Sequence, residues 1–85
     1  MKLLWSELAR ADRREIYDYI EADNPRAAIA IDMRFDAAVA RLRDFPESGR
    51  PGRADGTRKL VVSGTPYIIP YSLSANLFLG YISNN

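Results

Sequence analysis

The 85-residue sequence contains neither cysteine nor histidine. Without cysteine there are no disulfide cross-links, a composition compatible with a reducing compartment. Sites for transition metals built from thiolates or imidazoles are excluded as well, and no acidic loop cluster indicates oxygen-ligated Ca²⁺ or Mg²⁺. We therefore expect no metal and no cofactor.

Charge is absent from the C-terminal part of the chain. All 12 basic and 11 acidic residues lie before Leu60, and the residues from Leu60 to Asn85 include no Lys, Arg, Asp or Glu. An uncharged segment of this kind predicts a sheet that is buried or covered by a partner. Acid–base or phosphate-binding chemistry then has to come from the first 59 residues or from tyrosines.

Chain length predicts a single small domain over residues 1–85. Such a chain buries only about 60% of its unfolded surface and is marginally stable, so we expect a bound partner to stabilise it. The net charge of +1 is too small to steer the whole molecule towards nucleic acid. Glu7 and Arg10 interrupt the apolar start, which predicts no signal peptide, no membrane span and a cytoplasmic protein.

Two helices are predicted before residue 46. Ser6 is a favourable N-cap for a helix over residues 7–22, with one apolar side made of Leu8, Ala9, Ile16, Tyr19 and Ile20. Asn24 and Pro25 start a second helix, whose apolar seam is Ala28, Ile31, Phe35, Ala38, Leu42 and Phe45. The short connection predicts a helical hairpin. The seam is too short for a coiled-coil homodimer, so we expect it to pack on the first helix and the sheet.

The remaining elements are predicted to be strands, over residues 2–5, 58–63, 67–73 and 77–82. Residues 45–57 are rich in Gly and Pro and predict a long surface loop, of a length that is often functional. Pro70 predicts a bulge or a locally unpaired position. The expected fold is α+β, in the order β-α-α-β-β-β, with a helical hairpin on a small antiparallel sheet.

Both faces of this sheet are apolar. By alternation, Tyr67, Ile69, Tyr71 and Leu73 share one face, which we expect to be the core. The opposite face is predicted to be covered by a partner, because antiparallel sheets normally leave one side polar and this side is not. Its residues include Ile68, Pro70, Phe78 and Ile82.

The densest basic group is Arg50, Arg53, Arg58 and Lys59. These cations either contact a target or nucleic-acid phosphates, or they are solvated loop residues that pair with carboxylates. Without interleaved aromatic residues the second interpretation is slightly favoured, and both stay open. On the first helix, Arg10, Arg13 and Arg14 are expected to be a solvated face.

The sequence contains five short motifs in a fixed order: IYDYI at 16–20, DNPRAA at 23–28, FPESGRPG at 45–52, RKLVV at 58–62 and GTPY at 64–67, followed by Tyr71. These motifs and their order resemble the RelE/ParE toxin superfamily of type II toxin–antitoxin modules, also called plasmid stabilisation proteins. The resemblance covers roughly residues 3–71 and fits the ParE-like branch better than the ribosome-dependent nucleases.

The resemblance implies a small toxin with a RelE/ParE-like fold that a cognate antitoxin neutralises. The antitoxin would be a ribbon-helix-helix or similar protein of the ParD type, and DNA would be contacted only through it. DNA gyrase is the implied target, with Arg50, Arg53, Arg58 and Lys59 as target-binding residues. The implied antitoxin-binding residues are Ile68, Pro70, Phe78 and Ile82.

The first alternative is a ribosome-dependent mRNA endonuclease of the RelE type, with Arg58, Lys59 and Tyr81 as catalytic candidates. Val61 and Ile68 stand where that branch has basic residues, and the tail over residues 72–85 lacks the basic C-terminus. RNA cleavage needs convergent cations, so this depletion favours a binding inhibitor over an enzyme. A degenerate, non-toxic member that still binds antitoxin is the second alternative. The tail is explained either by natural divergence or by a frameshift or truncation after about Tyr71, and the sequence leaves both open.

Overall fold

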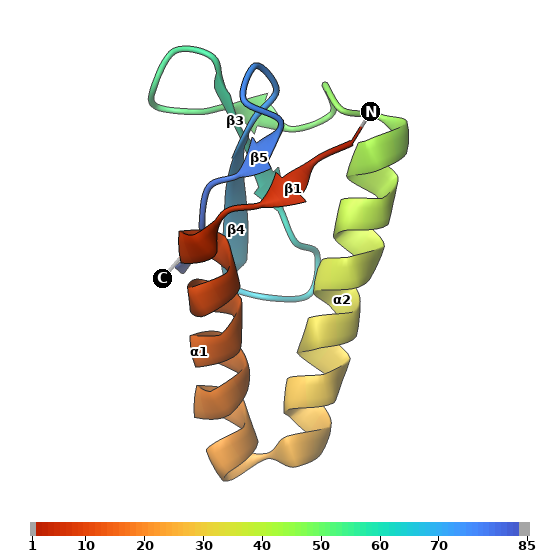
Figure 1. The fold of residues 1–85 in the computed structure, drawn as a ribbon. Coiled ribbons are helices and arrows are strands. Elements are labelled where there is room, and N and C mark those ends of the chain that lie inside the picture. Colours follow the sequence, from red (N-terminus) through yellow and green to blue (C-terminus); the bar gives the residue numbers. More distant parts are fainter. Residues whose placement is uncertain (1, 84–85) are drawn as a thin grey trace.

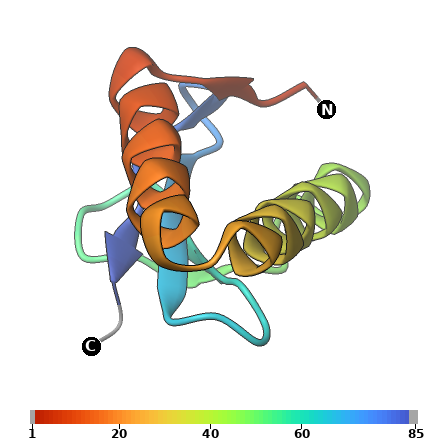
Figure 2. The same ribbon diagram turned by 90° about the horizontal axis from the view of Figure 1, so that it is seen from below.

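The computed structural model describes residues 2–83, which form a helical hairpin packed against one face of a sheet (Figures 1 and 2). The α+β fold and the predicted order of elements are confirmed, with two further short strands. The elements are β1 (Leu4–Trp5), α1 (Glu7–Asp23), α2 (Pro25–Asp44), β2 (Arg50–Pro51), β3 (Thr57–Val61), β4 (Tyr67–Ser72), β5 (Leu77–Phe78) and β6 (Ile82–Ser83).

Capping side chains set the ends of the helical hairpin. The Ser6 hydroxyl accepts a hydrogen bond from the Ala9 amide at 3.0 Å, and the Asn24 side chain accepts one from the Ala27 amide at 3.2 Å. Asn24 also closes α1, because its own amide donates to the Ile20 carbonyl. The two helices therefore meet at a single residue and diverge from it towards the sheet (Figure 1).

The packed side of α1 agrees with the prediction at Ala9, Ile16 and Ile20 and differs from it at Leu8 and Tyr19. Leu8 and Tyr19 are 63% and 81% exposed. The least exposed positions on α1 form a stripe at helical spacing. Compared with the predicted apolar side, this stripe is rotated about the helix axis, so that Leu8 and Tyr19 lie at its edges. This stripe is Ala9, Asp12, Arg13, Ile16, Tyr17 and Ile20.

The apolar seam of α2 is confirmed over most of its length. Ala28, Phe35 and Leu42 are buried, and Val39 joins them. Phe45 is 65% exposed, contrary to the prediction. It is the C-cap of α2, with its amide bonded to the Arg41 carbonyl, so its side chain no longer follows the helical repeat.

The sheet is mixed, whereas an antiparallel sheet was predicted. Its strand order is β1-β5-β4-β3-β2, with β6 also paired to β4. The parallel pair is β1 with β5, where Leu4 lies opposite Leu77. Parallel neighbours need a long connection between them, and the helical hairpin is part of that connection. The predicted loop 45–57 also contains β2, and β3 begins at its last residue, Thr57.

The predicted strand over residues 77–82 is divided into β5 and β6. Between them the Leu79 amide donates to the Pro70 carbonyl at 2.8 Å, and the Tyr81 amide donates to Asp12 Oδ2 at 3.0 Å. Pro70 has no amide hydrogen to offer a neighbouring strand, and the break lies opposite it. Pro70 stays paired with Lys59 of β3 on its other side. Of the two predicted alternatives, a bulge or an unpaired position, the structure shows the bulge, since Tyr71 lies opposite Phe78 but Ile68 lies opposite Ile82.

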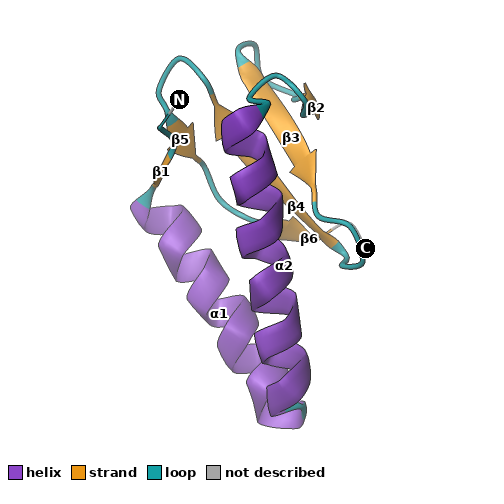
Figure 3. Ribbon diagram, turned by 90° about the vertical axis from the view of Figure 1, so that its right-hand side faces the viewer, coloured by secondary structure: helices purple, strands orange, loops and turns teal. Residues whose placement is uncertain are grey.

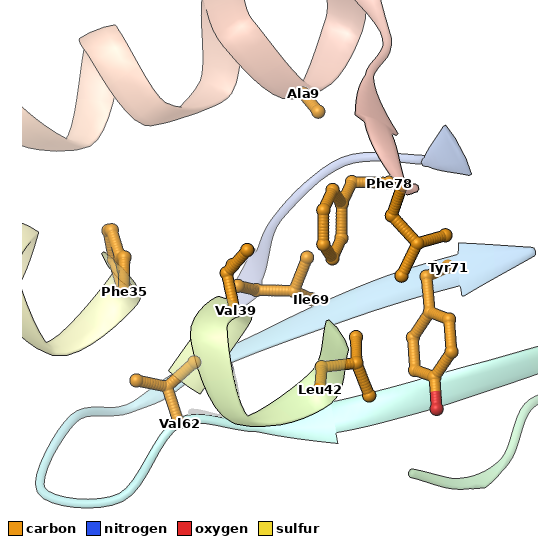
Figure 4. Close-up of a cluster of buried hydrophobic side chains, with 9 residues drawn as sticks. Ala9, Phe35, Val39, Leu42, Val62, Ile69, Tyr71 and Phe78 are labelled. Atoms are coloured by element: carbon orange, nitrogen blue, oxygen red, sulfur yellow. The ribbon is translucent and has the colours of Figure 1, made fainter. Parts of the chain in front are cut away.

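The core lies between the hairpin and the face of β4 that carries Ile69 and Tyr71, both 0% exposed (Figure 4). Those two residues were predicted to be there. Phe78 was predicted on the opposite face, and this is wrong, because Phe78 is also 0% exposed. It pairs with Tyr71 across the strands, so their side chains share a face, and its ring stacks on Trp5 at 4.4 Å. Among residues 2–83, neither helix has the length and hydrophobicity that a transmembrane span requires.

Candidate functional site

The face of the sheet that points away from the helices is called the free face below. Strand pairing places Val61, Ile68 and Ile82 in one row on it, since Val61 lies opposite Ile68 and Ile68 lies opposite Ile82. Pro70 and Lys59 form the next row. Val61 and Ile82 are 42% and 53% exposed. The structure thus brings Ile68, Pro70 and Ile82 together as predicted, without Phe78. Val61 was not predicted for this surface, although its alternation with Lys59 in β3 could have revealed it.

The predicted basic group separates into two parts. Arg50 and Lys59 lie opposite each other on β2 and β3, and Arg53 is exposed in the turn that follows β2. Arg58 faces the other way, since neighbouring residues of a strand alternate in direction. Its Nη1 donates to the carbonyls of Glu47 and Gly49, both at 3.0 Å. Arg58 therefore holds the loop and is not part of an exposed basic surface with the other three.

A buried tyrosine fixes the same loop. The Tyr71 hydroxyl donates to the Pro46 carbonyl at 2.8 Å and accepts from the Gly49 amide at 3.0 Å. Burial raises the pKa of Tyr71, and the Gly49 amide offsets part of this rise. A Cβ on Gly49 would collide with the Tyr71 hydroxyl, so the close approach requires glycine at that position. Tyr71 and Arg58 together hold residues 46–49 in place, directly before β2.

The three catalytic candidates do not converge. Lys59 is on the free face, and Arg58 is occupied with loop carbonyls. Tyr81 packs on the helix side, with its ring 4.9 Å from that of Phe35 and 5.8 Å from that of Trp5. The Tyr81 hydroxyl is buried and has no hydrogen-bond partner among residues 2–83. Burial raises the pKa of this phenol well above its usual value, although the charge of nearby Arg13 offsets part of the rise.

Arg13 was predicted to be solvated and is instead a partly buried structural residue. Its guanidinium donates to Asp32 Oδ1 at 2.7 Å and to Asp36 Oδ1 at 2.8 Å, which joins α1 to α2. It also lies over the rings of Trp5 and Phe35, at 5.3 and 5.7 Å from their centroids. Burial opposes its charge, but the hydrogen bonds with the two carboxylates outweigh burial and raise the pKa of Arg13.

A groove of about 400 Å³ separates the C-terminal half of α2 from the outer edge of β3. Figure 3 shows these two elements side by side, with β2 next to β3. We call this the α2–β3 groove. Its lining includes four basic residues and no acidic one: Arg34, Arg41, Arg50 and Lys59. Within residues 2–83, the ion pairs all belong to Arg13, so these four cations have no acidic partner in the described structure.

Arg34 and Arg41 were not among the predicted site residues. They are seven positions apart on α2, a spacing that returns a side chain to the same helix face. That signal was present in the sequence, but it gave no indication that β3 lies opposite. The described residues contain no group of three or more Asp or Glu side chains placed to hold a metal ion.

The comparisons with known proteins agree on one family. A family model described as "ParE toxin of type II toxin-antitoxin system, parDE" matches residues 3–79. The putative toxin Y4kP of Sinorhizobium fredii is 43% identical over 76 residues, which are 89% of this chain and 79% of that protein. Toxin RelE2 of Caulobacter vibrioides is 37% identical over 76 residues, 89% of this chain and 84% of that protein.

A solved structure shows the same fold. It is a chain of the chromosomal ParDE TA system from P. aeruginosa, with a TM-score of 0.85 and 25% sequence identity. The similarity covers 98% of this chain and 95% of that one. The family match also extends past Tyr71 to residue 79, and Phe78 in this stretch is a core residue. A reading frame shifted directly after Tyr71 does not fit these two findings.

Proposed function

The chain belongs to the ParE toxin family of type II toxin–antitoxin systems, and on this premise we propose that it binds and inhibits DNA gyrase and is neutralised by a ParD-like antitoxin. The separation of Arg58, Lys59 and Tyr81 is the observation that carries the choice of a binding inhibitor. A nuclease needs its cations and its proton donor around one scissile phosphate. A binding inhibitor needs only a surface. Exposed Arg50 and Arg53, together with half-buried Lys59, supply a basic one.

The antitoxin contact is proposed on the free face of the sheet. Val61, Ile68, Pro70 and Ile82 form an apolar patch there, and apolar patches on small proteins mark interaction surfaces. Covering this patch would also give a chain of 85 residues stability that its own small core cannot supply. In this proposal the antitoxin is a ribbon-helix-helix or similar protein, and any DNA contact of the complex is made by the antitoxin. The two proteins act in the cytoplasm and stabilise plasmids.

Plasmid topology in growing cells tests the proposed target. Induction of the chain is expected to arrest growth and to relax a reporter plasmid, as seen on chloroquine gels, because gyrase maintains negative supercoiling. Co-expression of the antitoxin should restore both growth and supercoiling. Growth arrest with normal supercoiling and cleaved mRNA would contradict the proposal and support the RelE-type nuclease. No growth arrest would indicate the degenerate member.

The antitoxin contact is tested by placing charge in the patch. Ile68→Glu combined with Ile82→Glu should leave growth arrest intact and prevent neutralisation, because carboxylates would be buried without partners under the antitoxin. Ile29→Glu is the matched control, since Ile29 is 52% exposed on α2, away from the patch. Full neutralisation of the double variant would show that the antitoxin binds elsewhere.

A further inference from the structure

We propose that a hollow between α1 and the sheet binds a linear aliphatic polyamine, with ammonium groups on the carboxylates of α1 and methylene groups against tyrosine rings. The hollow has a volume of about 390 Å³ and is called the tyrosine hollow below. Its lining includes three tyrosines and two acidic residues: Asp12, Glu15, Ile16, Tyr19, Tyr67 and Tyr81. This binding site goes beyond the proposed toxin function and does not depend on it.

One wall of the tyrosine hollow is a single face of α1. Asp12, Glu15, Ile16 and Tyr19 stand at positions i, i+3, i+4 and i+7 of the helix, a spacing that places side chains along one side. Tyr19, at the end of this row, is 81% exposed. The wall therefore offers two carboxylates, an aliphatic side chain and an aromatic ring that packs on little else.

The opposite wall comes from the sheet. Tyr67 is the first residue of β4, and Tyr81 directly precedes β6. Both rings pack on Phe35 of α2, with centroid distances of 5.7 and 4.9 Å. The Asp12 carboxylate joins the two walls, because it accepts the hydrogen bond from the Tyr81 amide. The hollow is thus formed before any ligand enters, and a ligand would order few side chains on binding.

The charge of the tyrosine hollow favours a cation. Its lining includes no basic residue, and within residues 2–83 the ion pairs all belong to Arg13, so Asp12 and Glu15 have no basic partner there. An ionised carboxylate can accept about four hydrogen bonds, so the bond from one backbone amide leaves Asp12 with capacity for a ligand. Arg13 itself is paired with two carboxylates, those of Asp32 and Asp36, so it does not compensate this negative charge.

The rings favour an organic cation over a metal ion. The face of a tyrosine ring attracts an ammonium group, and apolar stems gain by contact with rings and with Ile16. Ca²⁺ and Mg²⁺ instead require about six or more oxygen ligands. The described residues contain no group of three or more Asp or Glu side chains placed to hold a metal ion. Two carboxylates beside three tyrosines therefore suit an alkylammonium ligand.

The spacing of the carboxylates favours a ligand with two or more ammonium groups. Side chains three positions apart on a helix have Cβ atoms about 5–6 Å apart. A diamine with four methylene groups between its nitrogens can consequently place one ammonium group near Asp12 and the other near Glu15. The methylene groups then lie over Ile16, which stands between the two walls. A longer polyamine would extend its next ammonium group towards the exposed ring of Tyr19.

Such a ligand would also stabilise the folded chain. It would contact α1 together with the connection between β5 and β6, which Asp12 holds by a single hydrogen bond to the Tyr81 amide. A ligand that binds only the folded state raises the melting temperature as its concentration increases. Exposed charges are screened by salt, so both the binding and the stabilisation should weaken at high ionic strength.

The test is an NMR titration of the full chain with 1,4-diaminobutane at low ionic strength. We expect saturable binding, a shift of the Tyr81 amide signal, and at least tenfold weaker binding by Asp12→Asn/Glu15→Gln, in which Asn retains an oxygen acceptor for that amide. The matched control is Asp18→Asn/Glu21→Gln, which has the same charge change at exposed positions of α1 outside the hollow. It should bind as the unaltered chain does, and equal binding by Asp12→Asn/Glu15→Gln would overturn the site.

Substitutions of Tyr19 test the contribution of the rings. Tyr19→Ala should bind the diamine several-fold more weakly, whereas Tyr19→Phe keeps the ring and should bind as the unaltered chain does. Neither substitution threatens the fold, since Tyr19 is 81% exposed. Unchanged binding by Tyr19→Ala would overturn the contact with this ring.

Competing ligands separate the remaining outcomes. No saturable binding of 1,4-diaminobutane overturns the proposal. Displacement of the diamine by Mg²⁺ at equal ionic strength would overturn the assignment to organic cations and indicate a general acidic surface. Butylamine, with one ammonium group, should bind more weakly than the diamine, and equal affinity would contradict the contact with both carboxylates. Tighter binding of the peptide acetyl-Gly-Lys-Gly-amide would assign the hollow to a lysine of a protein partner instead.

Discussion

At the scale of single residues, Tyr81 distinguishes a nuclease from a binding inhibitor. Its hydroxyl is buried without a hydrogen-bond partner within residues 2–83, and the ring packs on Phe35 and Trp5. Tyr81→Phe removes only this hydroxyl. We expect unchanged growth arrest, and a free energy of unfolding that is equal or higher by up to about 1 kcal/mol, because an unpaired buried polar atom is lost. Growth assays and urea unfolding provide the two readouts, and loss of growth arrest in a folded variant would support the nuclease.

Two buried phenols also predict alkaline instability. Burial raises the pKa of Tyr71 and of Tyr81 above the ordinary value of 10.0. Above about pH 10 the unfolded chain releases these protons while the folded chain keeps them, so the free energy of unfolding falls as pH rises, by at most about 1.4 kcal/mol per pH unit for each phenol. Below pH 10 both states keep these protons and the contribution is constant.

Urea unfolding between pH 8 and pH 11 checks this slope. Tyr81→Phe should show a shallower fall than the unaltered chain, because one of the two phenols is gone. Tyr19→Phe serves as the control, since Tyr19 is 81% exposed and should leave the slope as it is. An identical fall in the Tyr81→Phe variant would contradict the prediction.

The directions of individual side chains were predictable only within one strand. Alternation placed Ile69 and Tyr71 in the core and Ile68 and Pro70 opposite them, and this was right. Phe78 was misplaced because its direction depends on the register with Tyr71, which the sequence does not reveal. The role of Arg58 was missed for a related reason. The carbonyls that it binds belong to a loop whose path is set by a contact with Tyr71, 25 residues away from Pro46.

At the scale of elements, the helices were predictable because their signals are local. Ser6, Asn24 and Pro25 define helix ends by capping chemistry within three or four residues. The sheet depends on distant partners. The parallel pair of β1 with β5 and the division of residues 77–83 into β5 and β6 arise from contacts with segments far away in the sequence.

One such contact is Asp12, which holds the connection between β5 and β6 against α1. Its carboxylate accepts from the Tyr81 amide at 3.0 Å, across 69 residues of sequence. Asp12→Ala should lower the free energy of unfolding by about 1–2 kcal/mol, because a partly buried amide loses a charged acceptor. Hydrogen exchange at the Tyr81 amide should become faster. Asp12→Asn retains an oxygen acceptor and should lose less, so equal losses in the two variants would contradict this role.

At the scale of the whole molecule, the uncharged C-terminal part has two roles. Its inner side, with Ile69, Tyr71 and Phe78, forms the core (Figure 4). Its outer side carries Ile68 and Ile82, which form an apolar surface. A partner that covered this surface would stabilise the folded state of such a small chain. The charged N-terminal part supplies the basic groove along β3. The candidate site could be partly predicted, because the apolar patch lies within a few adjacent strands, whereas the groove combines α2 with β3.

The most direct test of the central claim is a gyrase supercoiling assay with the purified chain, run beside a ribosome-dependent mRNA cleavage assay. The account predicts inhibition of supercoiling that depends on Arg50 and Lys59, is relieved by the antitoxin, and is accompanied by intact mRNA. Cleaved mRNA with normal supercoiling would contradict it.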